Sequence, residues 1–100
     1  MPGVSRKDDA LTTGHATCDA TSTLDTPGQT TVKANGILIA RIGDDTVSHD
    51  QPSGSSCVPH TASITTGSGT VRIGGAYVAR IGDSVDSGSL TGGSSTVNVG

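Results

Sequence analysis

The chain has 100 residues, of which 31% are apolar and only one, a tyrosine, is aromatic. A chain of this length makes one small domain, and this composition supplies too few large apolar side chains for an extensive hydrophobic core. Nine acidic and six basic residues give a net charge of −3, which argues against a nucleic-acid-binding protein because no basic patch is available.

The N-terminal segment carries no recognisable targeting signal. Its first ten residues, MPGVSRKDDA, lack the apolar stretch of a secretory signal peptide, and no run elsewhere reaches membrane-spanning length. We therefore expect the protein to be made in the cytoplasm without a signal peptide. In that reducing compartment a disulfide between Cys18 and Cys57 is less expected than thiol or metal chemistry.

The first expected element is an extended segment in residues 1–9. Within it, VSRKDD at residues 4–9 mimics IARIGD at residues 39–44, which belongs to a longer repeat. Residues 10–30 follow as a polar stretch rich in Thr, Ser, Gly and Asp. A stretch of this length without apolar periodicity is expected to be a long loop, either functional or disordered.

The strongest signal is a repeated segment that reads as a hairpin. Residues 31–44 are TVKANGILIARIGD and residues 70–83 are TVRIGGAYVARIGD, with eight of fourteen positions identical. Asn35-Gly36 between two apolar runs is typical of a two-residue hairpin turn, because both turn residues require positive φ. In the first copy this predicts strands at residues 31–34 and 37–42.

The remaining segments complete a three-unit pattern. Residues 45–66 form a second polar stretch, again expected to be a long loop. Residues 96–100, TVNVG, mimic the start of the repeat. A third unit is therefore predicted, split between residues 1–9 and 93–100, so that the last strand meets the first. With no helical periodicity, the chain is predicted to be a single all-β domain with pseudo-threefold symmetry.

All three histidines and both cysteines fall in the two polar stretches. His15 and Cys18 form H-x2-C in the first, while Cys57 and His60 form C-x2-H in the second, where His49 also lies. Such short gaps allow neighbouring side chains to reach one ion, and zinc binds both imidazole nitrogen and thiolate sulfur. One ion joining both stretches would supply stability that a thin core does not.

The residues alone leave other interpretations open. The same side chains are compatible with solvated loop residues, with a Cys18–Cys57 disulfide, or with a catalytic Cys–His pair. The catalytic interpretation lacks nearby apolar residues to build a pocket. The aspartates at the repeat turns are expected to bond to the turn backbone or to pair with arginines; these are Asp8, Asp9, Asp44, Asp45 and Asp83, with Arg6, Arg41 and Arg80.

The repeated segments VKANGILIARIGD and VRIGGAYVARIGD resemble the PAAR-repeat family, named for a Pro-Ala-Ala-Arg motif. Here the motif reads LIAR at residues 38–41 and YVAR at residues 77–80, which keeps the Ala-Arg half within a V-x3-G-x3-AR-[IV]-GD frame. The segment DDALTTGH near the N-terminus also resembles the family's opening, with Asp8 in place of a Gly. The resemblance covers essentially the whole chain.

The resemblance implies a small cone-shaped all-β fold of three hairpin repeats with a metal-pinned apex. Its base would cap a trimeric β-helical spike, one copy per trimer, in a contractile phage tail or type VI secretion system. The apex would touch the target cell envelope transiently. The metal, zinc with iron as the alternative, would be held by His15, His49, Cys57 and His60, which leaves Cys18 without a counterpart.

The preferred function is therefore a structural spike tip without enzymatic activity, located at the end of the tail or spike in the mature particle. The alternative from another class is a small metal-dependent enzyme or a metal-binding regulator. For an enzyme, three protein ligands plus a water are expected in place of a closed four-ligand site. A further alternative is an adaptor that loads a separate effector onto the spike.

Overall fold

The computed structural model describes residues 1–100 and contains strands but no helix, which confirms the all-β prediction. The strands pair antiparallel in five two-stranded hairpins. No segment forms a helix of the length and apolarity that crossing a membrane requires. In chain order the hairpins are β1 (Ala10–Thr12) with β2 (Thr21–Thr23), β3 (Lys33–Ala34) with β4 (Ile37–Leu38), β5 (His49–Ser53) with β6 (Ser56–His60), β7 (Arg72–Ile73) with β8 (Ala76–Tyr77), and β9 (Ser84–Val85) with β10 (Gly88–Ser89).

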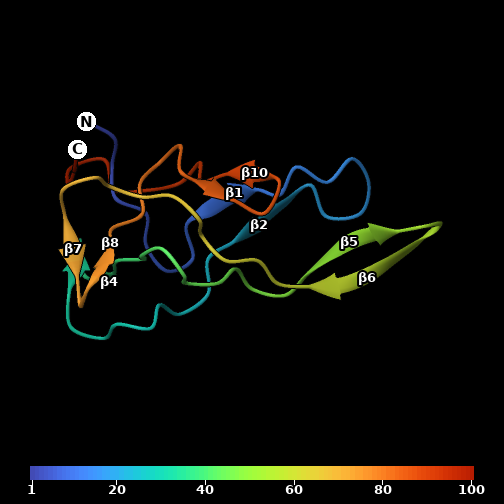
Figure 1. Ribbon diagram of the computed structural model, residues 1–100, viewed down its shortest axis with the longest axis horizontal. Helices are drawn as coiled ribbons and strands as arrows, with labels where there is room; N and C mark the ends of the chain where they lie inside the picture. The colour runs from blue at the N-terminus through green and yellow to red at the C-terminus, as the bar shows by residue number, and fades with distance from the viewer.

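The molecule is elongated, with principal extents of 41 × 24 × 21 Å. Hairpins β3–β4 and β7–β8 lie at one end together with both chain termini, and we call this end the base (Figure 1). Hairpin β5–β6 projects alone at the opposite end, which we call the tip. Hairpins β1–β2 and β9–β10 lie between the two ends.

The base hairpins form where the repeat predicts them but are shorter than predicted. Their turns, Asn35-Gly36 and Gly74-Gly75, have positive φ at both residues, as a two-residue hairpin turn requires. The return strand β4 ends at Leu38 rather than continuing to residue 42. The next residue, Ile39, still donates its NH to Val32 O of its own hairpin at 3.1 Å, but it also bridges to Arg6 of another unit, and the two-stranded ladder stops there.

The residues after each return strand close a ring around the pseudo-threefold axis. Ser5 N donates to Ala79 O, Ala79 N donates to Ala40 O, and Ala40 N donates to Ser5 O, each at 3.0 Å. These three residues occupy the same position in the three units, and all are 0% exposed. Three small, fully buried side chains therefore lie where the three segments meet: the alanine of each AR motif and the serine that replaces it.

The two chain ends supply the third base hairpin between them. Gly3 bridges to Asn98, Val4 N donates to Val97 O, and Val99 N donates to Pro2 O. The segments at the two ends of the chain are therefore neighbours, in the position that a continuous hairpin occupies in the other two units (Figure 1).

Each unit leaves the ring through the same turn. The backbone NH of Arg6, of Arg41 and of Arg80 donates, at 2.8 Å, to the carboxylate of the aspartate three residues later, as the residues alone indicated. The residue before each aspartate has positive φ: 69° at Asp8, 95° at Gly43 and 96° at Gly82. Asp8 therefore occupies a backbone conformation for which the repeat otherwise uses glycine.

The hydrophobic core consists of two small clusters and does not extend into the tip. The larger cluster contains Leu11, Leu24, Ala40, Ile64, Ala79, Val85 and Leu90, and the smaller contains Val4, Ala34, Ile39 and Val78.

The prediction of long loops at residues 10–30 and 45–66 was wrong in part, because both stretches contain a hairpin. Their strands carry few apolar residues, so hydrophobic alternation did not reveal them.

Candidate metal centre

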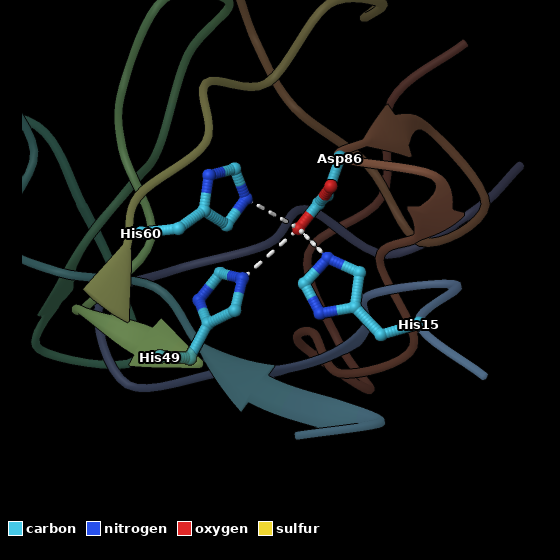
Figure 2. Close-up of side chains that lie close together, drawn as sticks. All are labelled: His15, His49, His60 and Asp86. Carbon is cyan, nitrogen blue, oxygen red and sulfur yellow. Dashed lines mark hydrogen bonds and ion pairs between the residues drawn. The ribbon is translucent and has the colours of Figure 1, made fainter. Parts of the chain in front are cut away.

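Four side chains from three different hairpins point toward one another (Figure 2). His15 lies in the loop between β1 and β2, and Asp86 lies in the turn between β9 and β10. His49 begins β5 and His60 ends β6, and the two are directly opposite each other in the antiparallel register. Each of the three units therefore contributes to one cluster.

The three imidazoles converge on one carboxylate oxygen. Nε2 of His49 and Nε2 of His60 each lie 2.9 Å from Asp86 Oδ2, and Nε2 of His15 lies 3.0 Å from the same atom. One ligand atom from each of the four residues lies within 4.8 Å of all the others. The side chains are shielded, with exposures of 3% for His49, 7% for His15, 9% for Asp86 and 21% for His60.

Two of the histidines are oriented by backbone carbonyls. Nδ1 of His15 lies 3.1 Å from Asp50 O, and Nδ1 of His49 lies 3.0 Å from Val47 O. A carbonyl oxygen only accepts, so both Nδ1 atoms carry the proton and donate. In the neutral rings Nε2 then presents a lone pair to the centre of the cluster, where it faces the Asp86 carboxylate. Electron-rich atoms at these distances require a cation among them, either protons on the rings or a metal ion.

The carboxylate of Asp86 is ionised. When the ring protons supply the cation and the imidazoles carry a proton at Nε2, burial raises the pKa of Asp86, but the hydrogen bonds from His49 and His60 and the positive charge of His15 outweigh burial and lower this pKa to about 2. An ionised carboxylate is the form that binds metal ions. The cluster therefore offers three imidazole nitrogens and one carboxylate oxygen.

This donor set fits a transition-metal ion. Zinc in proteins is commonly four-coordinate and accepts His nitrogen and Asp oxygen, and iron accepts the same atoms. The carbonyl bonds at Nδ1 of His15 and His49 are also those that usually orient metal-ligating histidines and fix their tautomer. His15, His49, His60 and Asp86 would hold the ion, which would supply positive charge and rigid links between the three hairpins.

The structure corrects the predicted role of Cys57. The Sγ atoms of Cys18 and Cys57 are joined in a disulfide, so Cys57 is not available as a thiolate, and the less expected pairing is the one that forms. The physical reason for the error is strand geometry. Cys57 and His60 both lie in β6, where residues three apart point to opposite faces, whereas the C-x2-H interpretation assumed a loop.

Asp86 is the residue that sequence reasoning missed. It lies in a short segment after the second repeat that contains no His or Cys and was therefore not considered. A signal was present: Asp86 is the only ionisable residue between Asp83 and the end of the chain. In a three-unit fold, each unit is expected to contribute to a shared centre, and Asp86 is the only candidate ligand in the segment that follows the second repeat.

The comparison with protein families agrees with this architecture. The model of the PAAR motif matches residues 13–91, a stretch that includes both complete repeats and all four residues of the cluster. Comparison with curated proteins found no match. The family match supports a structural role as a spike tip in contractile injection systems. Because the match covers well over half of the sequence, the chain belongs to the PAAR-repeat family.

Proposed function

We propose that the protein caps the end of a trimeric β-helical spike as a single copy and that a bound metal ion holds its leading end rigid. The supporting observation is the closed ring of hydrogen bonds among Ser5, Ala40 and Ala79, which gives one chain three nearly equivalent faces. A monomer with three similar faces matches the threefold end of a homotrimer, so one copy suffices per spike.

Exposed apolar side chains at the base suit such a contact. Val32 and Val71 occupy the same position in their repeats and are 39% and 37% exposed, and Ile37 in β4 is 36% exposed. Apolar side chains arranged in this way favour a protein partner over water. The acidic net charge adds no preference for nucleic acid.

The tip needs a stabilising element other than a core. No residue between His49 and His60 belongs to either apolar cluster. An ion bound by His15, His49, His60 and Asp86 would join this hairpin to the two others, and structural zinc can supply roughly 10–16 kcal/mol of apparent binding free energy. A rigid narrow end would concentrate the contraction force on a small area of the target envelope. No turnover is required.

The capping proposal is tested by stoichiometry. The protein is mixed with a trimeric β-helical spike, and the mass of the complex is measured by native mass spectrometry. One copy per trimer is expected, and three copies per trimer would contradict the proposal. The double variant Val32→Asp/Val71→Asp should lose binding, whereas Ser55→Asp, an exposed change in the β5–β6 turn, should retain it.

The metal proposal is tested separately. Metal content of the purified protein is measured by inductively coupled plasma mass spectrometry, and the ligands are identified by X-ray absorption. One zinc per chain with nitrogen and oxygen neighbours is expected, and the same coordination by iron would assign the alternative metal. A protein that binds neither metal stoichiometrically would contradict the proposal.

A further inference from the structure

The loop that carries His15 is joined to the tip hairpin by one covalent link, the disulfide between Cys18 and Cys57. We propose that this disulfide is a positioning crosslink for the metal centre. It holds His15 beside His49 and His60, so that the oxidised protein retains the metal and the reduced protein releases it. The inference rests on the metal centre proposed above and adds to it a dependence on thiol redox state.

On one side, the His15 loop is fixed to the turn that carries Asp86. Ser87 N donates to Thr13 O at 2.9 Å. Gly14 packs so closely against Ser87 that a Cβ on Gly14 would lie 2.2 Å from the Ser87 carbonyl oxygen. His15 and Asp86 are thus held together by backbone contacts that do not involve either cysteine.

On the other side, the noncovalent contacts to the tip hairpin are few and partly solvated. Asp19 N donates to Asp50 O at 3.2 Å, and Asp50 N donates to the Asp19 carboxylate at 2.8 Å in an exposed bond. Nδ1 of His15 donates to the same Asp50 carbonyl. Exposed hydrogen bonds add little net stability because water competes for both partners. Water does not compete with the disulfide, which also joins the His15 loop to the tip hairpin.

The tip hairpin has no apolar anchor that would replace the crosslink. Among residues 49–60 only His49 is buried, and none belongs to a core cluster. Without the disulfide, the His15 loop and the hairpin gain freedom to move apart. Metal binding must then order both segments before three imidazoles face one ion, and that entropic cost weakens the affinity.

The redox step is an ordinary thiol–disulfide exchange. Oxidation breaks the two S–H bonds of Cys18 and Cys57 and forms one S–S bond. The two electrons and, through exchange with solvent, the two protons go to a disulfide oxidant, whose S–S bond breaks to give two thiols. Cys57 is exposed, so such a reagent can reach its sulfur.

The test compares the oxidised wild type with the double variant Cys18→Ser/Cys57→Ser. Zinc affinity is measured by competition with a chromogenic chelator, and we expect it to fall by about tenfold or more in the double variant. Thr17→Ala, an exposed change beside Cys18, serves as the matched control and should keep the wild-type affinity. Equal affinities in the wild type and the double variant would overturn the proposal.

A second measurement does not depend on the variant's folding. By linkage, bound metal must favour the disulfide by the same factor by which the disulfide favours the metal. The fraction of oxidised wild type is therefore measured in glutathione redox buffers, with and without zinc, after alkylation of free thiols. A shift toward the disulfide is expected when zinc is present.

The outcomes separate this proposal from the one it rests on. Tighter binding in the reduced wild type, with a thiolate-to-cobalt charge-transfer band after cobalt substitution, would overturn the crosslink role, because the cysteines would then be ligands. Failure of the oxidised wild type to bind zinc or iron would instead overturn the metal centre itself.

Discussion

His49 and His60 face each other across the β5–β6 ladder, and Nε2 of each lies 2.9 Å from the same oxygen of Asp86. The two histidines belong to the hairpin that forms the tip, and the aspartate belongs to a turn of another unit. The Asp86 carboxylate is therefore a link between the projecting hairpin and the body of the molecule, in addition to the Cys18–Cys57 disulfide. This connection gives Asp86 a larger role in the centre than its position in a short turn suggests.

Replacement of Asp86 by Asn should weaken metal binding while preserving the shape of the side chain. The amide is neutral and is a weaker ligand than a carboxylate, so we expect affinity for zinc to fall by at least about tenfold. The measurement is competition with a chelator of known affinity. Asp45→Asn is the matched control, because Asp45 is exposed and accepts a hydrogen bond from Ser63 rather than from a histidine. Retention of wild-type affinity by Asp86→Asn would exclude Asp86 as a ligand.

Removal of the metal should lower thermal stability in the wild type and have no effect in His60→Ala. At a free metal concentration 1,000 times the Kd, binding adds about 4 kcal/mol of stability. For a domain of this size that corresponds to a rise in Tm of roughly 15–30 °C. Melting curves recorded with and without a chelator provide the measurement. A wild-type Tm that does not respond to the chelator would show that the ion contributes no stability.

Substitution of Gly14 by Ala should be far more damaging than substitution of Gly54 by Ala. Both glycines have positive φ, 76° at Gly14 and 61° at Gly54, so each alanine is expected to cost about 1–2 kcal/mol in backbone strain. At Gly54 the new methyl group meets open space, whereas at Gly14 it meets the Ser87 carbonyl and displaces the loop that carries His15. Urea unfolding measures stability, and chelator competition measures metal affinity. Gly54→Ala should retain full affinity, and equal effects of the two changes would refute the close packing at Ser87.

The contribution of Asp83 to stability should depend on pH. Burial raises the pKa of Asp83, but hydrogen bonds from the side chain and backbone of Arg80 and from Thr66 outweigh burial, and the net pKa lies below the ordinary value of 3.8. Because the folded pKa is the lower one, the stabilisation is present above pH 3.8 and is lost as pH falls through the folded value. Asp83→Asn should therefore destabilise the protein at pH 7 by about 1–3 kcal/mol, and the difference from wild type should narrow below pH 4.

This comparison is made by urea unfolding with a chelator present throughout, so that loss of metal at low pH does not contribute. Asp25→Asn provides the control, because Asp25 is exposed and its side chain accepts a hydrogen bond only from the adjacent Thr26 NH. A difference between Asp83→Asn and wild type that stays constant from pH 7 to pH 3 would contradict the assignment.

The base of the fold was readable from the sequence because its signals are local. Asn35-Gly36 and Gly74-Gly75 dictate their turns through backbone conformation alone, and the repeated AR and GD pairs mark the ring and the turn that follows it. The lengths of the strands were not readable. Ile39 keeps one backbone bond to Val32 of its own hairpin but also bridges to Arg6 of another unit, and such a contact between units depends on the closure of the whole ring.

The candidate site was predicted less completely because it combines segments that are distant in sequence. His15, His49 and His60 stand out by residue type, and the structure brings these three together. Cys57 also stood out, but its place in a strand turns it away from His60 and toward Cys18. Asp86 resembles any other turn aspartate, and only the approach of the β9–β10 turn to the other two hairpins distinguishes it.

The closed ring of three units within one chain determines what kind of ion site the leading end can have. A homotrimer repeats every side chain three times, so ligands around its axis are supplied in threes. In this chain, Asp86 lies three residues after the aspartate that ends its ring turn. The residues at the same position in the other two units are Val47 and Thr12, and neither has a carboxylate. Because the three units belong to one chain, their sequences can differ, and three nitrogens and one oxygen can therefore meet at one point. A spike built from identical subunits cannot present that set by itself, whereas a single-chain cap can.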